Sequence, residues 1–98
     1  MLENIQHHFG AGVYIREGYI PMGMKIGKHT HSYDHYSILA TGVVSVLAGG
    51  VMTGYKAPAC IKIPAGVEHE VLAFVDSVWY CIHGTTDEIP DLNDVKIE

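Results

Sequence analysis

The sequence has little positive charge, and none of it is concentrated in one stretch. Six Lys and Arg residues stand against eleven Asp and Glu residues, which gives a formal net charge of −5. A protein that grips a nucleic-acid backbone needs clustered Lys and Arg to neutralise the phosphates. Nucleic acid is therefore not expected as a partner.

Long apolar runs are also missing. No stretch approaches the roughly 20 apolar residues that a membrane-spanning helix requires. The N-terminal residues MLENIQHHFG lack the charged-then-apolar order of a signal peptide. We therefore expect a cytoplasmic protein without a membrane partner.

Cysteine is scarce and has no metal-binding or disulfide spacing. Cys60 and Cys81 are the only two cysteines, and they form no CxxC pair. This disfavours both a disulfide framework and a thiolate zinc site. Because free cysteine is usually interior, we predict that Cys60 is a small buried apolar residue.

Helical periodicity is nearly absent, and short extended segments take its place. These segments are rich in β-branched and aromatic residues or alternate with a period of two, and Gly, Pro or Asp bounds each of them. They span residues 12–20, 20–26, 35–42, 43–50, 59–64, 69–75 and 77–84. Many short strands in so short a chain predict an all-β fold, a small antiparallel sandwich or barrel. The acidic tail at 87–98 is predicted to be a loop or a short final strand.

The chain is short for a self-sufficient domain. We expect its 98 residues to form one domain, 1–98, which buries only about 60–65% of the surface that the unfolded chain exposes. A bound metal ion or a second subunit would add stability. Residues 12–20 have the composition of an edge strand that can add to a partner's sheet, so we predict a homodimer.

Histidine, in contrast, is abundant. Three of the seven histidines fall within the stretch HTHSYDH. Residues two apart in a strand point to the same face, so His29 and His31 can converge on one ion. His35 follows a short turn and can reach the same face from the next strand, and His69 follows a turn that contains Pro and Gly. Alternating polar residues are also typical of a solvated strand face, so spacing alone leaves both interpretations open.

The order of these residues resembles the two sequence motifs of the cupin family. The first motif, G-x5-H-x-H-x3,4-E-x6-G, corresponds to residues 23–42 and has its defining positions at Gly23, His29, His31, His35 (for the glutamate) and Gly42. The second motif, G-x5-P-x-G-x2-H-x3-N, corresponds to residues 58–73 and has Pro64, Gly66 and His69 in register, with Pro58 and Ala73 in place of its Gly and Asn. The resemblance implies a cupin barrel, a jelly-roll-like double-stranded β-helix.

The exchange of glutamate for His35 makes the site similar to that of the four-histidine cupins. The resemblance implies that His29, His31, His35 and His69 hold one divalent transition metal ion, with Mn favoured and Fe, Ni, Cu or Zn as alternatives. Neutral imidazoles suit such ions and suit Mg or Ca poorly. Four ligands in an octahedral arrangement leave two places, which fit a bidentate substrate or one substrate atom beside O2.

Strand alternation supplies further candidates for the pocket. Within residues 77–84, one face carries Trp79, Cys81 and His83, and the other carries Tyr80 and Ile82. We favour the first set as inward-facing, because cupins often present side chains of the final strand toward the metal. Cys81 and His83 then become candidate catalytic residues, with Trp79 and Ile26 as pocket-lining residues.

Three functions remain open at this stage. The first is an oxygenase of the dioxygenase type that acts on a small organic substrate. The second is a metal-dependent lyase or isomerase, which needs a general base; Tyr33, Tyr36 and His83 are the visible candidates. The third is a non-catalytic small-molecule-binding module in which the metal serves as a ligand clamp or a structural brace. Tyr36 is our third candidate catalytic residue because it adjoins His35.

Overall fold

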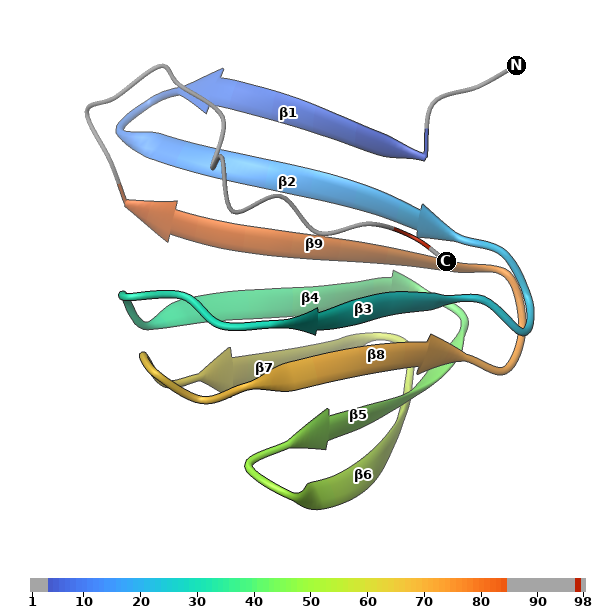
Figure 1. The fold of residues 1–98 in the computed structure, drawn as a ribbon. Helices are drawn as coiled ribbons and strands as arrows, with labels where there is room; N and C mark the ends of the chain where they lie inside the picture. Colours follow the sequence, from blue (N-terminus) through green and yellow to red (C-terminus); the bar gives the residue numbers. More distant parts are fainter. Residues whose placement is uncertain (1–3, 85–96, 98) are drawn as a thin grey trace.

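A computed structural model gives the fold and describes residues 4–84 and 97. These residues form nine strands and no helix, so the all-β prediction is confirmed (Figure 1). The strands are β1 (Ile5–Gly10), β2 (Val13–Ile20), β3 (Lys25–His29), β4 (His35–Thr41), β5 (Val43–Ala48), β6 (Val51–Lys56), β7 (Ala59–Ile63), β8 (His69–Ala73) and β9 (Ser77–Gly84). Within this part of the chain no helix could cross a membrane.

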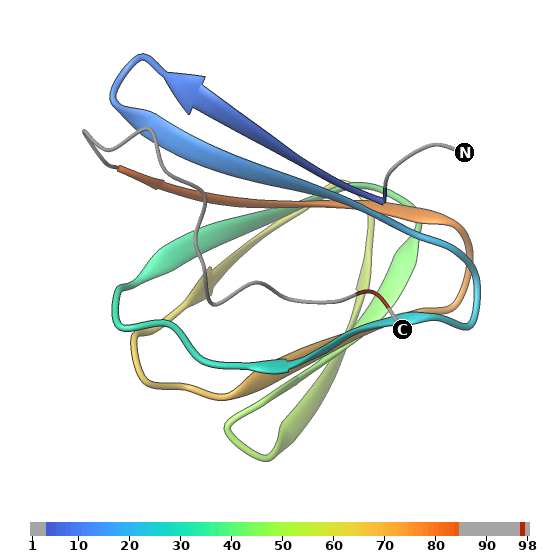
Figure 2. The same ribbon diagram turned by 45° about the horizontal axis from the view of Figure 1, so that its top comes forward.

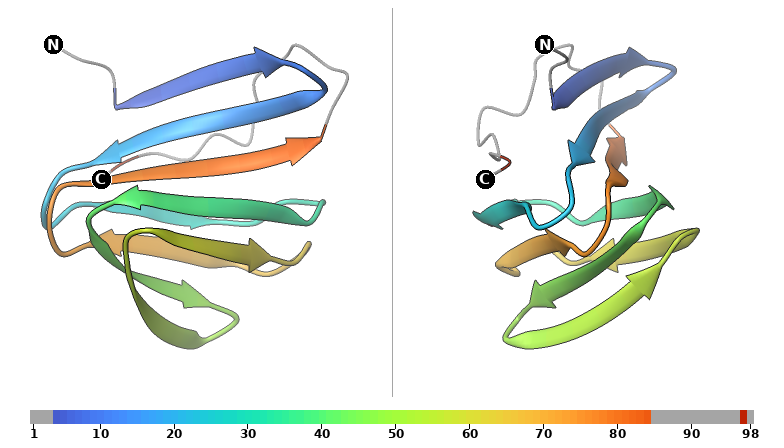
Figure 3. Two further views of the ribbon diagram at one scale, coloured as in Figure 1. Left: turned by 180° about the vertical axis from the view of Figure 1, so that it is seen from behind. Right: turned by 90° about the vertical axis from the view of Figure 1, so that its right-hand side faces the viewer.

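The strands form two antiparallel sheets that pack against each other. The five-stranded sheet has the order β1-β2-β9-β4-β7, and the four-stranded sheet has the order β3-β8-β5-β6. Figures 2 and 3 show how the two sheets enclose the interior of a small barrel. The apolar core lies between them, since its fully buried side chains come from both sheets: Ile20, Leu39 and Trp79 from the first, Val44 and Val71 from the second.

Register arranges the inward side chains of the five-stranded sheet in rows across the strands. One row, which we call the polar row, consists of Arg16, Cys81, Ser37 and Ile61. The apolar row below it consists of Gly18, Trp79, Leu39 and Ala59. Above it, toward the end of the barrel where β4 begins and β9 ends, lie Tyr14, His83, His35 and Ile63. Successive rows are two residues apart along each strand, or about 7 Å.

The four-stranded sheet is irregular where it reaches the same end of the barrel. Ile26 pairs with Val71 and His29 pairs with His69, so three residues of β3 span the same length as two of β8. This is a β-bulge at residues 27–28, and it lets Ile26 and His29 face the interior although they are an odd number of residues apart. Without the bulge, His29 would point to the outer face.

Two expectations about the N-terminal half are wrong. Strand β2 is not an edge, because it lies between β1 and β9; the edge strands of this sheet are β1 and β7. The polar composition of residues 5–10 concealed β1, yet it pairs with β2 along its whole length. Residues 20–26 are also not one strand. Gly23 has φ +82° and the Met24 amide donates to the Pro21 carbonyl at 3.0 Å, so the chain turns between β2 and β3.

Two further predictions concern Cys60 and the acidic tail. Cys60 is exposed rather than buried, because alternation along β7 turns its neighbours Ile61 and Ile63 inward. Within the predicted acidic tail, residues 87–96 and 98 lie outside the described residues. Ile97 forms an isolated antiparallel bridge with Ile26 and packs against the core.

Candidate metal centre

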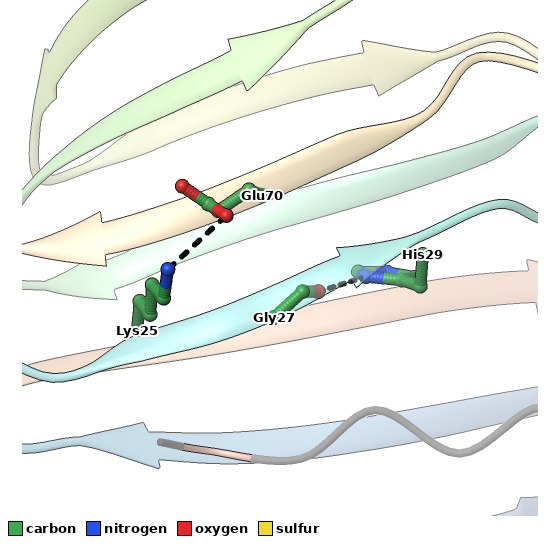
Figure 4. A network of polar contacts seen from close by, with 4 residues as sticks. All are labelled: Lys25, Gly27, His29 and Glu70. Atoms are coloured by element: carbon green, nitrogen blue, oxygen red, sulfur yellow. Dashed lines mark hydrogen bonds and ion pairs between the residues drawn. The ribbon is translucent and has the colours of Figure 1, made fainter.

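The four histidines of the two motifs lie at one end of the barrel. His29 ends β3 and is paired in register with His69, the first residue of β8. His35 opens β4 on the opposite sheet, and His31 lies in the turn between β3 and β4. Outside the cluster, a contact between Lys25 Nζ and Glu70 Oε2 at 3.4 Å also joins β3 to β8 (Figure 4).

The imidazole rings are close to one another. Ring nitrogens of His29, His31 and His69 all lie within 4.8 Å of one another. The centroids of the His29 and His69 rings are 3.9 Å apart. The His35 ring lies 5.0 Å from the His31 ring and 5.5 Å from the His69 ring. The structure therefore brings three of the histidines into one group and places His35 directly beside it.

Two turns hold this arrangement together. The Gly66 amide donates to the His31 carbonyl at 2.9 Å, and the Ala65 amide donates to Asp34 Oδ1 at 2.8 Å. Gly66 has φ +77°, a conformation that glycine adopts without the steric penalty of a Cβ. The turn before β8 is thus tied to the turn before β4, and the backbones that carry His31, His35 and His69 are fixed relative to one another.

Backbone carbonyls set the tautomer of three rings. His29 Nδ1 donates to the Gly27 carbonyl at 2.8 Å (Figure 4), and His69 Nδ1 donates to the Val67 carbonyl at 3.0 Å. His35 Nδ1 lies 3.4 Å from the Tyr36 carbonyl. A carbonyl oxygen can only accept, so the proton sits on Nδ1 and the lone pair sits on Nε2. A carbonyl contact of this kind is how proteins commonly orient histidines for metal binding.

The Nε2 atoms of these same three rings, His29, His35 and His69, are buried and have no hydrogen-bond partner among the described residues. A buried acceptor without a hydrogen bond costs about 1–3 kcal/mol of folding free energy. A ligand that binds all three nitrogens would remove this cost at three neighbouring places. Burial lowers the pKa of His29 to about 3 and the pKa of His35 to about 4, and it also lowers the pKa of His69. The rings are therefore neutral near pH 7.

These donors fit a transition metal ion. Two imidazole nitrogens bound to one ion at about 2.1 Å lie at most about 4.2 Å apart. The ring nitrogens of His29, His31 and His69 lie within 4.8 Å of one another, so small ring rotations would bring them to metal-binding distance. Neutral imidazole is a ligand for Mn, Fe, Ni, Cu and Zn. The donor set and its orphaned lone pairs both match that class of ion.

The other sequence candidates lie around this cluster rather than in it. The His83 ring packs on the Tyr33 ring at 4.2 Å, and the Tyr33 ring stacks on the His31 ring at 5.0 Å. Tyr36 is 53% exposed while both of its neighbours are buried, so its side chain leaves on the outer side of the sheet. His83 is near the cluster through Tyr33, whereas Tyr36 faces away from it.

A hollow of about 430 Å³ lies where β4 begins and β9 ends. Tyr36 and its cross-strand neighbours Lys62 and Ile82 line it from the outer face of the five-stranded sheet, together with His35 and His83. The hollow is therefore on the outer side of this sheet and does not border His29, His31 or His69. The expected lining residues Ile26 and Trp79 do not contribute to it; they border a separate space of about 10 Å³. Both side chains lie farther from this end of the barrel than the histidines do. Trp79 belongs to the apolar row, and Ile26 precedes His29 along β3, opposite Val71. Cys81 is buried in the polar row and borders neither space.

Arg16 also belongs to this region, although it was not predicted as a site residue. Arg16 is 3% exposed, and its Nη2 donates to Cys81 Sγ at 3.5 Å. Its positive charge contributes to the lowered pKa of His29, His35 and His69, so it lies near all three rings. Alternation in residues 13–20 places Arg16 on the same face as Tyr14, which is the signal that could have revealed it.

No protein-family model and no curated protein matches the sequence. Solved structures do match the fold. A cupin 2 conserved barrel domain protein from Salinispora arenicola has a TM-score of 0.74 at 19% identity, over 88% of this chain and 81% of that chain. KdgF from a Halomonas species has 0.73 at 16%, over 87% and 82%. A cupin-2 domain protein from Shewanella frigidimarina has 0.69 at 17%, over 83% and 79%.

Proposed function

Because this chain has the cupin fold, we propose that it is a metal-dependent cupin protein that acts as an oxygenase on a small organic substrate. One observation carries the proposal: three buried imidazole lone pairs, on the neighbouring rings of His29, His35 and His69, have no hydrogen-bond partner among the described residues. We expect one divalent transition metal ion per chain. Mn ranks first, with Fe, Ni, Cu and Zn as alternatives.

His29, His31, His35 and His69 would hold this ion, which would supply Lewis acidity and a binding place for O2. The protein's own residues then fix the surroundings. Backbone carbonyls hold the imidazoles in the tautomer that offers Nε2. The apolar row beneath the polar row keeps water from the lower side of the histidine cluster.

A second candidate is a lyase or isomerase, and one observation favours it. His83 packs on Tyr33, which stacks on His31 of the cluster, and its Nδ1 donates to the Gly84 carbonyl at 3.1 Å. Its Nε2 therefore carries a lone pair and can accept a proton from a substrate as a general base. His83→Gln would abolish a lyase or isomerase reaction, whereas an oxygenase reaction would retain activity.

A binding module without catalysis is the third candidate. The first experiment tests the metal centre that all three candidates share. Metal content is measured by elemental analysis of the untagged parent, His35→Ala, His69→Ala and the control His8→Ala. His8 contacts Glu17 at 3.0 Å, away from the cluster. One equivalent of metal in the parent and the control, with a loss of about tenfold or more in the other two, supports the centre. O2 consumption with diketones and phenols then tests the oxygenase.

A homodimer remains our prediction. Among the described strands of the five-stranded sheet, β1 rather than β2 offers its edge for pairing with a second copy. Sedimentation of the parent and of a His7→Pro variant, which is altered in the middle of β1, would show whether that edge is used.

A further inference from the structure

The outer face of the five-stranded sheet carries apolar side chains where a solvated face would carry polar ones. Residues that alternate with the buried residues of β2, β4 and β9 point outward on this face. Register places five of them in two neighbouring rows, which we call the apolar patch: Ile15, Ile82 and Tyr36 in one row, Tyr80 and Ile38 in the next. Tyr36 is 53% exposed, and the other four are partly exposed.

The outer face of the four-stranded sheet is different. It carries Lys25 and Glu70, whose side chains contact each other at 3.4 Å across β3 and β8, and Lys56, which is exposed on β6. One outer face of the barrel is therefore charged, whereas the middle of the other is apolar. An antiparallel sheet with a solvated outer face has polar residues there, so the apolar patch indicates that another layer covers it.

The charged residues on the outer face of the five-stranded sheet lie at opposite margins of the apolar patch. Within the described strands of this sheet they are Glu17 on β2 and Lys62 on β7, with β9 and β4 between them. Glu17 Oε1 contacts His8 Nε2 at 3.0 Å on the same face, and Lys62 is exposed. A face with one negative and one positive margin is complementary in charge to a second copy of itself.

The positions of these two charges select the way in which two copies can pack. A two-fold axis parallel to the strands, between β9 and β4, places β2 of one copy over β7 of the other. Glu17 then lies one row from the partner's Lys62, about 7 Å along the strands, a distance that the two long side chains can span. An axis perpendicular to the strands would instead bring Glu17 to the partner's Glu17, and like charges repel.

The size and the shape of the face also suit a second copy. Five strands about 4.8 Å apart and roughly 20–25 Å long give about 500–600 Å² per copy, so two copies together reach the roughly 1,000 Å² that a specific interface needs. The hollow of about 430 Å³ lies at the side of the apolar patch, between Tyr36, Lys62 and Ile82. The same axis places the partner's Ile15 opposite Lys62, at the rim of this hollow, where an apolar side chain can fill it.

We infer that the outer face of the five-stranded sheet is the interface of a homodimer, in which two copies pack face to face around an axis parallel to the strands. This inference deepens the prediction of a homodimer and does not depend on the metal centre. It differs from pairing through the β1 edge, because side chains of the apolar patch make the contacts instead of backbone groups.

Sedimentation equilibrium of the full chain over a range of protein concentrations tests the interface. The samples are the parent, Tyr36→Lys, Glu17→Lys, Lys62→Glu, an equimolar mixture of the last two variants, and the control Lys56→Glu. The control reverses the same charge on the outer face of the other sheet. The melting temperature of each sample is recorded to show that the variant is folded, and Tyr36, as an exposed residue, tolerates the change.

We expect the parent and Lys56→Glu to dimerise with equal affinity. Tyr36→Lys puts a charge into the apolar patch and should weaken the dimer about 100-fold or more. Glu17→Lys and Lys62→Glu should each weaken it about tenfold, because each reversal replaces two symmetric attractions by repulsions. The mixture should regain the parent's affinity, since each variant then meets the opposite charge on its partner.

Three results would overturn the inference. A parent that stays monomeric would refute both this interface and the homodimer, whatever its metal content. A dimer that Tyr36→Lys and both charge reversals leave unchanged would refute the interface, and loss of that dimer in His7→Pro would assign it to the β1 edge. A mixture that associates as weakly as its two components would refute the two-fold arrangement.

Discussion

Lowering the pH from 8 to 5 should destabilise the protein after a chelator has removed its metal. Burial holds the pKa of His35 at about 4 and the pKa of His29 at about 3, against about 6.5 in an unfolded chain. Both folded-state values are lower, so the unfolded chain takes up protons that the folded protein refuses. Stability is therefore full above pH 6.5 and falls as the pH drops toward 4 and 3.

The size of the effect follows from these values. At pH 5 the difference for His35, which is 4% exposed, corresponds to about 2 kcal/mol. His29 is only half-buried, and water screens it, so it adds less than its pKa alone implies. The total loss should lie at about 2–4 kcal/mol, a large share of the roughly 5–15 kcal/mol that stabilises a typical domain.

Urea unfolding followed by circular dichroism at pH 8, 7, 6 and 5 measures this loss in the free energy of unfolding. His35→Gln should show a loss smaller by about 2 kcal/mol, because it removes one titrating ring. His8→Ala changes an exposed histidine and should behave as the parent does. A parent that is equally stable at pH 8 and pH 5, or a His35→Gln variant as acid-sensitive as the parent, would refute the reasoning.

Further predictions concern the metal, a turn and a glycine. In the metal-loaded protein, metal content should hold at about pH 6 and fall as the pH drops toward 4 and 3, where protons begin to compete for His35 and His29; a loss already complete at about pH 6 would argue against a site of buried imidazoles. Asp34→Ala removes the acceptor of the Ala65 amide and should weaken metal binding about tenfold, measured by chelator competition, without unfolding the protein. Gly42→Ala should cost more than about 3 kcal/mol in a urea titration, because its φ is +99° and a Cβ there would lie 2.1 Å from Ser77 Oγ. Gly50→Ala, at φ +82° with nothing within 4 Å, should cost only about 1 kcal/mol; equal losses would contradict the steric explanation.

The strands could be predicted where alternation and turn residues agree. The predicted segment at 77–84 coincides with β9, and the segment at 12–20 differs from β2 only at Gly12. Strand β1 could not be predicted, because polar residues on an edge strand carry no core signal and only the partner strand defines them. The exposure of Cys60 was not predicted for a related reason. Cysteine generally prefers the interior, but in β7 the inward face is taken by Ile61 and Ile63, and alternation leaves Cys60 on the outer face.

Some features of the candidate metal centre could also be predicted from the sequence, and others could not. Spacing and resemblance predicted one site of His29, His31, His35 and His69. The structure groups His29, His31 and His69 and places the His35 ring beside them. The tautomers could not be predicted, because they depend on which carbonyl lies beside each Nδ1. The bulge that turns His29 inward was hidden as well, because bulges depend on the pairing of two strands. Arg16 was missed since a charged residue in a strand is expected to face water. Alternation puts it on the same face as Tyr14, but the pairing with β9 is needed to show that this face is the interior.

The histidines of the cluster belong to different sheets: His29 and His69 lie on the four-stranded sheet, and His35 lies on the five-stranded sheet. An ion bound by all three would act as a covalent cross-link does, joining two layers that otherwise hold together by apolar packing and by the hydrogen bonds between their turns. The separation of the sheets then requires the ligand bonds to break. Resistance of this barrel to pulling forces and to proteases would accordingly depend on the concentration of free metal in its surroundings.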